Sequence, residues 1–355
     1  MAKKKTPETL PTTPEPETVT APSAVLLPTH DLVHQTRLLR DALESEKRRV
    51  GFFLGAGCPL GIYDDQGEKS IKHIPDVAGL TQVICDELAA SGEKESGEKG
   101  SDFKSSWDVL TSDCRSEGGA EPNVEHILTQ LRTICALKGS GEVNGMNATQ
   151  LRDLDVKICE VIAKTVGIKL PEYITSYHRL AAWISHIDRP VPLEVFTPNY
   201  DLLIEEAFEN SKVPFFDGFI GAREPFFDIA AMEQDLLPPR WTRLWKMHGS
   251  INWIKRNDES VDRSNHEKTQ GAQLLIYPSH LKYDQSRRMP YLAMIDRFRA
   301  FFRDDNAVLV ICGYSFADDH LNEVLLNGLR ANRSAQCFAL MYGSLAECEI
   351  ASAHA

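Results

Sequence analysis

Short apolar runs alternate with helix-like segments along the second half of the chain. The runs are continuously hydrophobic, as strands buried on both faces of a parallel sheet are. They predict strands over residues 193–197, 242–247, 273–277, 307–312 and 335–341. Apolar residues at helical spacing predict helices over residues 201–210, 291–303 and 318–330. A regular alternation of this kind is typical of parallel strands joined by crossover helices.

An isolated apolar run at 50–54 predicts one further strand, far upstream of the others. An ordinary doubly wound fold places the next strand about 30 residues later, whereas here it begins near residue 193. Helix-like segments fill this interval, and a Gly-, Ser-, Glu- and Lys-rich stretch at 91–106 is typical of an exposed loop. The segments cover residues 75–90, 121–137, 150–167 and 172–187. We therefore predict an α/β, Rossmann-like fold with an about six-stranded, mostly parallel sheet and a helical insertion over about residues 75–190.

The two ends of the chain differ from its middle. Residues 1–28 are mainly Pro, Thr, Glu and Lys, which predicts a disordered tail because little can be buried there. An arm that orders on a neighbouring subunit is the alternative. Residues 29–355 are expected to form a single domain. The pattern after residue 343 is typical of a helix that stops, as in a fragment of a longer protein.

Composition excludes several classes of function. The formal charge of −12, from 39 basic and 51 acidic residues, argues against a broad nucleic-acid footprint. No apolar stretch approaches the roughly 18 residues of a membrane span, and the N-terminus lacks the apolar segment of a secretory signal. The eight cysteines are scattered without a CxxC pair, which predicts reduced thiols, no zinc site and a cytoplasmic location.

Four polar clusters follow predicted strands, where doubly wound sheets bind ligands. The first is Gly55-Ala56-Gly57. Small residues after a strand allow backbone N–H groups to approach a phosphate. The alternative is simple tight packing.

The second cluster contains Asn199 and Asp201, in the turn between a strand and a helix. An amide followed closely by an acid suits the binding of ribose hydroxyls and of a carboxamide. The alternative is helix capping, which Asn and Asp both favour.

The third and fourth clusters follow the strands at 242–247 and 307–312. His248 precedes a Gly-Ser turn, where a histidine can titrate near neutral pH and act as a general base. Ser315, after Gly313, could bind a phosphate or ribose. The alternatives are a structural histidine and a turn in which Asp318 or Asp319 caps the next helix.

Five segments, taken in order, resemble the sirtuin-like family, in particular its bacterial branch of defence-associated NAD⁺ hydrolases. They are LGAG at 54–57, TPNYD at 197–201, KMHGSINW at 246–253, YPS at 277–279 and GYSFADDHLN at 313–322. The resemblance spans about residues 50–342. It implies that residues 29–355 form a sirtuin-like NAD-binding domain and that NAD⁺ is the substrate.

The resemblance also implies a role for each cluster. Gly55, Ala56 and Gly57 would approach the pyrophosphate of NAD⁺. Asn199 would hold the nicotinamide ribose or position a water, and Asp201 would lie near the nicotinamide amide. His248 would act as a base on a ribose hydroxyl or on water. Ser315 would contact the adenosine side, with Gly313 allowing close approach.

Two departures from the protein-deacylating members narrow the expected activity. Pro198 stands where deacylases usually carry Gln, and the four zinc-binding cysteines are missing. We therefore expect an NAD⁺ hydrolase that releases nicotinamide and ADP-ribose, in anti-phage defence by NAD⁺ depletion. A deacylase or ADP-ribosyltransferase and a non-enzymatic NAD⁺ or ADP-ribose sensor are the alternatives. Unrestrained hydrolysis would kill the host cell, so a homo-oligomer or a regulatory partner, such as an ATPase, is expected.

Overall fold

The computed structural model describes most of the chain, in two compact units, Met1–Arg40 and Asp41–Ala355. The described residues are 31–62, 74–94, 103–118, 121–137, 145–234, 237–256, 258, 260–264, 273–276 and 290–342. The tail predicted at 1–28, the segment 277–279 and the residues after 342 lie outside them. Within the first unit, the described residues from Leu32 onward are helical.

The second unit contains a sheet of six strands, all parallel, in the order β11-β10-β1-β2-β6-β3. These strands are β1 (Val50–Leu54), β2 (Glu194–Thr197), β3 (Phe215–Phe216), β6 (Thr242–Lys246), β10 (Val308–Cys312) and β11 (Gln336–Leu340). The α/β, Rossmann-like fold is therefore confirmed. From β1 the chain passes first to β2 and later to β10, on its other side, so the order of strands reverses at β1. Ligands of open α/β sheets bind beyond the carboxyl ends of the strands at such a point.

One predicted strand belongs to a different sheet. Residues 273–276 form β9 (Gln273–Ile276), which pairs antiparallel with β7 (Gly249–Lys255) in a second sheet of order β4-β5-β8-β7-β9. The prediction of 273–277 as a parallel strand was therefore wrong. An apolar run shows that a strand is buried but does not show which partner it pairs with. The sixth place in the parallel sheet is taken by β3, whose two residues are too few to show any periodicity.

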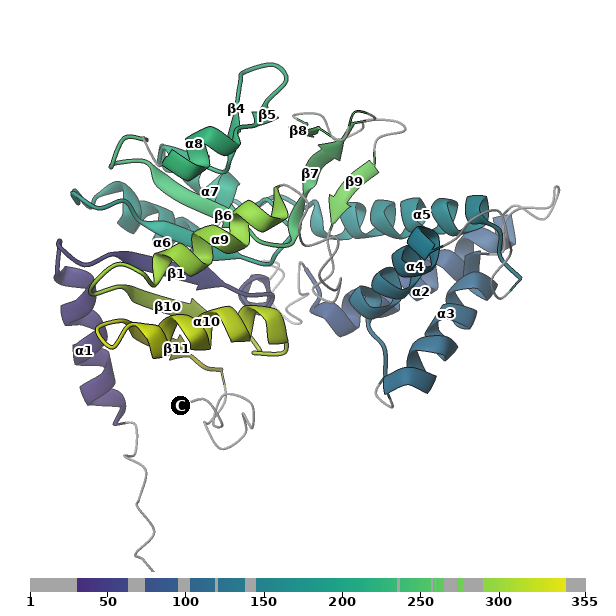
Figure 1. The fold of residues 1–355 in the computed structure, drawn as a ribbon, viewed down its shortest axis with the longest axis horizontal. Coiled ribbons are helices and arrows are strands. Elements are labelled where there is room, and N and C mark those ends of the chain that lie inside the picture. Colours follow the sequence, from purple (N-terminus) through teal and green to yellow (C-terminus); the bar gives the residue numbers. More distant parts are fainter. Residues whose placement is uncertain are drawn as a thin grey trace, which may run out of the picture. The chain divides into compact units, whose positions relative to one another are not determined.

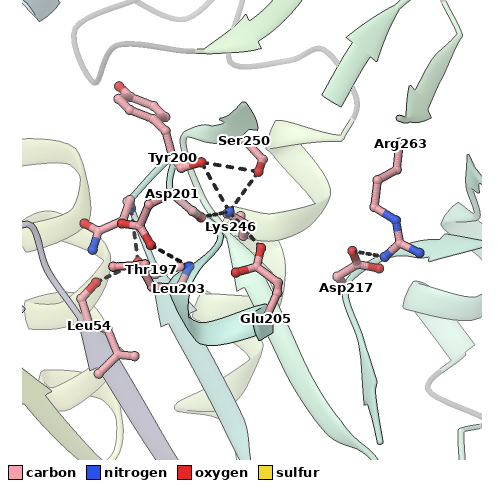
Figure 2. Close-up of polar contacts among 11 residues, drawn as sticks. Leu54, Thr197, Tyr200, Asp201, Leu203, Glu205, Asp217, Lys246, Ser250 and Arg263 are labelled. Atoms are coloured by element: carbon pink, nitrogen blue, oxygen red, sulfur yellow. Dashed lines mark hydrogen bonds and ion pairs between the residues drawn. The ribbon is translucent and has the colours of Figure 1, made fainter. Parts of the chain in front are cut away.

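The remaining strands of the second sheet are short. They are β4 (Phe219–Ile220), β5 (Phe226–Phe227) and β8 (Val261–Arg263). Asp217, which follows β3, accepts a hydrogen bond from Arg263 Nη1 at 2.5 Å (Figure 2). This ion pair ties the last residue of β8 to the edge of the parallel sheet.

The helices are drawn with the strands in Figure 1. They are α1 (Leu32–Glu44), α2 (Val77–Lys94), α3 (Phe103–Gly118), α4 (Val124–Leu137), α5 (Ala148–Val166), α6 (Ser176–Ser185), α7 (Leu203–Asn210), α8 (Ile229–Gln234), α9 (Tyr291–Phe301) and α10 (Asp319–Ala331), with a short 3₁₀ turn, η1 (Pro59–Gly61). Most of the predicted helices are present. Of the stretch predicted as a loop, 91–106, the structure describes only the two ends, which belong to α2 and α3, and residues 95–102 lie outside the described residues.

The two faces of the parallel sheet carry different helices. Phe53 packs on Phe298 of α9, with ring centroids 5.7 Å apart, whereas Phe52 packs edge-on against Trp183 of α6 at 5.6 Å. Successive residues of a strand point to opposite faces, so α9 and α6 lie on opposite faces. Figure 1 shows α9 and α10 in front of the strands.

The helical insertion consists of α2 to α5, which pack on one another around buried apolar side chains. Ile84, Leu88, Leu110, Ile127 and Leu151 are all fully buried there. The fourth helix predicted for this region, α6, packs on α7 and on β1 instead and belongs to the sheet.

Candidate active site

The four polar clusters found in the sequence follow four strands that are neighbours in the sheet. β10, β1, β2 and β6 lie side by side in that order, and all are parallel. Their carboxyl ends therefore meet at one edge. The loops that begin at Gly313, Gly55, Asn199 and His248 are brought together there, although they are far apart in the sequence.

The loops after β1 and β10 are packed directly against each other. Gly55 N donates to Cys312 O at 2.9 Å, and Gly57 N donates to Gly313 O at 2.7 Å. A Cβ on Gly55 would lie 2.4 Å from the carbonyl oxygen of Gly313. Gly313 itself has a φ of +61°, and its Cβ would lie 2.5 Å from the backbone nitrogen of Cys58.

This geometry supports the packing explanation for the glycines. The N–H groups of Gly55 and Gly57 both donate within the protein. Ala56, between them, is exposed, and within the described ranges nothing accepts a hydrogen bond from its N–H. The Ala56 N–H is therefore the donor of this loop that remains for a ligand.

Asn199 is held at the junction of the β1 and β2 loops. Its side-chain Nδ2 donates to Gly55 O at 3.1 Å, and its backbone N–H donates to Thr197 Oγ1 at 3.1 Å. Thr197 Oγ1 in turn donates to Leu54 O at 2.7 Å (Figure 2). The amide of Asn199 is partly buried and fixed in orientation, as a group that binds substrate needs to be.

Asp201 is buried and lies one residue before Leu202, the N-cap of α7. Its Oδ1 accepts from the N–H of Leu203, the first residue of α7, at 3.1 Å. Burial raises the pKa of Asp201, although the nearby Lys246 and the backbone hydrogen bond oppose the shift. Asp201 thus bonds one N–H at the start of α7 without occupying the N-cap position that the capping alternative assigned to it.

Lys246, the last residue of β6, lies at the centre of a buried network that the sequence did not reveal. Its Nζ donates to Glu205 Oε1 and to Ser250 Oγ, each at 2.8 Å. It also donates to the backbone carbonyls of Asp201 and Tyr200 (Figure 2). The Lys246 side chain is 2% exposed, and burial raises the pKa of its partner Glu205 against the influence of the ammonium. One buried cation thus joins the β2 loop to the start of β7.

His248 lies two residues further on and faces a carboxylate of another loop. Its Nε2 is 3.1 Å from Asp318 Oδ2, and both side chains are buried. The other oxygen of Asp318 caps α10 by accepting from the N–H groups of His320 and Leu321. The His248 ring is stacked near Tyr291, with centroids 6.3 Å apart. The helix-capping explanation of Asp318 is correct, and the capping carboxylate also faces the histidine.

The His248–Asp318 pair shifts the ionisation of both members. Burial opposes the charged imidazolium, but the contact with Asp318 and a smaller contribution from Glu125 together raise the pKa of His248. The pKa of Asp318 is lowered, because His248 and the backbone donors of α10 outweigh its burial. The two facing atoms are within ion-pair distance but are not aligned as a hydrogen bond. Both atoms are buried and, within the described residues, make no hydrogen bond.

The loop after β10 is held by its own side chains. Tyr314 Oη donates to Asn322 Oδ1 at 2.9 Å, and Asn322 Nδ2 donates to Phe316 O at 2.6 Å. Phe316 is buried at a φ of +56°. Ser315 is exposed between these fixed positions. The geometry leaves Ser315 accessible to a ligand and does not test its role.

The described residues contain no group of three or more His, Cys, Asp or Glu side chains able to hold a metal ion. Free thiols are found at Cys58, Cys85, Cys159, Cys312 and Cys337. Burial raises the pKa of Cys58, which follows the Gly55–Gly57 segment, and raises that of Cys159 to about 12. Within the described ranges, no helix has the length and apolar character needed to cross a membrane.

Comparison with protein families supports a place among the sirtuin-like proteins. Residues 193–354 match the family model described as a SIR2-like domain. The match covers the loops of Asn199, His248 and Ser315, and it begins after the helical insertion. The sirtuin superfamily includes NAD⁺-using enzymes. No curated protein matches the chain.

Proposed function

We propose that the protein is an NAD⁺ glycohydrolase, which cleaves the bond between nicotinamide and ribose with water. The observation that carries the proposal is the convergence of Asn199 and the His248–Asp318 pair at one edge of a parallel sheet. A fixed amide and a titratable histidine are the groups needed to orient a ribose and to accept a proton. The SIR2-like match over the same loops supports NAD⁺ as the substrate.

The proposed reaction balances without a further cofactor. Water adds to C1′ of the ribose as the bond from C1′ to the pyridinium nitrogen breaks. The bonding electron pair goes to that nitrogen, so nicotinamide leaves as a neutral molecule. The proton of the water goes to a base, and ADP-ribose is the second product. The transition state has oxocarbenium character, as in other glycoside cleavages.

The residues at this edge have distinct proposed roles. Asn199 holds the nicotinamide ribose or the attacking water, and His248 accepts a proton from a ribose hydroxyl or from water. Asp201 shapes the nicotinamide end through its hydrogen bond to the start of α7. The N–H of Ala56, an exposed residue, would bind the pyrophosphate, and Ser315 would contact the adenosine side.

The glycines have a supporting role in this proposal. Gly55, Gly57 and Gly313 allow the β1 and β10 loops to approach each other closely enough for both to contact one dinucleotide. Each position would place a Cβ within 2.8 Å of neighbouring backbone. Their contribution to NAD⁺ binding is therefore indirect, through the placement of Ala56 and Ser315.

Hydrolysis is favoured over protein deacylation by three features of the sequence. Pro198 stands where deacylases usually have Gln, no cysteine pair forms a zinc module, and a helical insertion occupies the interval after β1. Transfer to water needs only the half of the site that binds the ribose. A deacylase would need an additional channel for an acylated lysine.

The test is to incubate the purified chain with NAD⁺ and to identify the products by mass spectrometry. We expect nicotinamide and ADP-ribose from the wild type and none from Asn199→Ala. The matched control is Asn210→Ala, at the exposed end of α7, which should retain full activity. NAD⁺ that stays intact would overturn the proposal. Calorimetric binding without turnover would favour a sensor, and products that require an acetylated peptide would favour a deacylase.

We further propose that the activity serves anti-phage defence by depleting cytoplasmic NAD⁺. Because constant hydrolysis would kill the host, a homo-oligomer or a regulatory partner such as an ATPase would restrain it. The measurement is cellular NAD⁺ after phage infection, with the wild type and with Asn199→Ala. NAD⁺ levels that do not differ between the two strains after infection would contradict this role.

A further inference from the structure

We propose that Glu125, which belongs to the helical insertion, is a positioning residue of the active site and acts through the hydroxyl of Tyr200. The expected effects on kcat rest on the proposed function. The expected effect on the position of the loop that carries Asn199 does not. The structure places one carboxylate of the insertion against this loop.

The start of α4 holds Glu125 in a defined place. Asn123 Oδ1 accepts from the N–H groups of Glu125 and His126 at 3.0 and 3.1 Å, as an N-cap does. The preceding N–H, of Val124, donates to Thr81 Oγ1 of α2 at 2.9 Å. The backbone around Glu125 is therefore bonded both within α4 and to a second helix of the insertion.

Tyr200 connects this end of α4 to the loop that carries Asn199. Its hydroxyl donates to Glu125 Oε1 at 3.3 Å, across 75 residues of sequence. Burial and the adjacent Glu125 raise the pKa of Tyr200, so its hydroxyl stays protonated and able to donate. Its carbonyl accepts from Ile251 N at 3.1 Å and from Lys246 Nζ at 3.5 Å. Tyr200 is thus held at its backbone by β6 and β7 and at its ring by α4, directly after Asn199.

The charge of Glu125 also reaches the other loops of the site. It contributes to the raised pKa values of His248, Tyr291 and Tyr314. The groups that act on His248 are Asp318 at the start of α10, Glu125 at the start of α4 and the stacked ring of Tyr291 on α9. Removing the negative charge of Glu125 should therefore lower the pKa of His248.

A partly buried ion pair fixes the same stretch of the insertion. Arg132, seven residues along α4, pairs with Asp155 of α5 at 2.8 Å. Its charge acts on Tyr200 in the opposite direction to Glu125, because it lowers the pKa of the hydroxyl. The α4–α5 pair of helices therefore presents fixed charges to Tyr200. A displacement of α4 would change both the position of Asn199 and the field at His248.

Two conservative variants separate the hydrogen bond from the charge. Tyr200→Phe removes the bond and keeps the carboxylate, whereas Glu125→Gln keeps an acceptor and removes the charge. For Tyr200→Phe we expect kcat to fall up to about tenfold, the effect of one hydrogen bond. For Glu125→Gln we expect kcat near that of the wild type at high pH and an acidic limb of the pH profile displaced to lower pH. Glu160→Gln, on the exposed face of α5, is the matched control.

Glu125→Ala and its combination with Tyr200→Phe complete the test. Since both changes break the same bond, kcat of the double variant at high pH should equal that of either single variant. Native-state hydrogen exchange over residues 197–203 should increase in Glu125→Ala and Tyr200→Phe and not in Glu125→Gln. This readout requires no NAD⁺ cleavage. Unchanged exchange and unchanged kcat in Glu125→Ala would overturn the inference. If exchange in the variants changes as expected but the wild type leaves NAD⁺ intact, only the proposed function is overturned.

Discussion

Lys246 and His248 are two residues apart at the end of β6, and both are buried, yet their surroundings differ in kind. The ammonium of Lys246 donates to two side chains and two backbone carbonyls (Figure 2). His248 has a carboxylate at 3.1 Å, but its Nε2 and the facing Asp318 Oδ2 make no aligned hydrogen bond within the described ranges. One buried charge is fully bonded by the protein, whereas the facing atoms of the other pair are not.

The difference separates a structural charge from a chemical one. A buried cation is stable only when its partners replace the water that it has lost, and Lys246 meets this condition completely. Glu205 Oε2, in the Lys246 pair, also lacks a hydrogen bond within the part of the chain that the structure describes, so an unbonded atom does not by itself mark a chemical site. What distinguishes His248 is a titratable ring whose pKa is raised by the facing carboxylate, as is common at functional sites. We therefore expect changes at Lys246 to act on stability and changes at His248 to act on the reaction.

The largest effect is expected for His248→Ala. Removing a general base typically costs 10²- to 10⁴-fold in rate, so NAD⁺ cleavage should fall by about that factor. The free energy of unfolding, from urea titration, should change much less than in variants of Lys246. His186→Ala, at the exposed end of α6, is the matched control for loss of an imidazole. A His248→Ala protein that unfolds at far lower urea and keeps its specific activity would reverse the comparison.

Lys246→Met should mainly destabilise the fold. It leaves the buried Glu205 without its cation, and breaking such a pair typically costs about 3–5 kcal/mol of unfolding free energy. Replacing both members, in Lys246→Met/Glu205→Leu, should recover part of this loss because no uncompensated charge remains. Lys164→Met, which breaks an exposed pair with Glu87, should change stability by about 0–1 kcal/mol. Urea unfolding of the four proteins gives these values, and a Lys246→Met variant as stable as Lys164→Met would contradict the structural role.

Gly313→Ala extends the comparison to the contact between the β1 and β10 loops. The added Cβ would meet the backbone of Cys58 at 2.5 Å, at a φ of +61° that L-residues rarely adopt. Local strain of this kind costs about 1–3 kcal/mol, so the melting temperature and NAD⁺ binding should both decrease. Gly61→Ala, where nothing lies within 4 Å of the new Cβ, is the control and should change neither. Equal effects of the two substitutions would show that the close approach of the loops is not needed.

The sequence revealed the loops of the candidate site but not the contacts between them. Asn199 and His248 could be found because each follows an apolar strand, and parallel strands end at a common edge. The Glu205–Lys246 pair and the Tyr200–Glu125 bond join positions 41 and 75 residues apart. Periodicity carries no information on such pairs, because it reports only which face of one element is buried.

The same limit explains the errors in the fold. Five of the six strands of the parallel sheet were predicted from their apolar runs. Residues 273–277 have the same apolar pattern, but β9 pairs antiparallel with β7, and pairing depends on the partner. β3 is two residues long and had no pattern to detect. At the ends of the 91–106 stretch, α2 and α3 extend into the predicted loop, because helix propensity is only a weak prior that packing overrides.

Asp318→Asn should have the smallest effect and is the sharpest test of the pair. Asn retains a side-chain oxygen for the cap of α10, so only the charge facing His248 is lost. A base must be neutral to act, so the rate falls as pH drops through the pKa of His248, which Asp318 raises. In the variant this limb should move to lower pH by about one unit, the effect of one adjacent charge.

The same pair makes the stability of the fold depend on pH. Because the pKa of His248 is raised, the pair stabilises the fold fully below the unfolded pKa of histidine and loses this contribution as pH rises through the folded value. The lowered pKa of Asp318 sets the opposite limit, because its contribution is lost as pH falls through the folded value. The stability that Asp318→Asn removes should therefore be greatest at mildly acidic pH. Profiles of kcat and of urea unfolding against pH provide both readouts, and an acidic limb that does not move in Asp318→Asn would mean that the proton controlling the reaction is not held by His248.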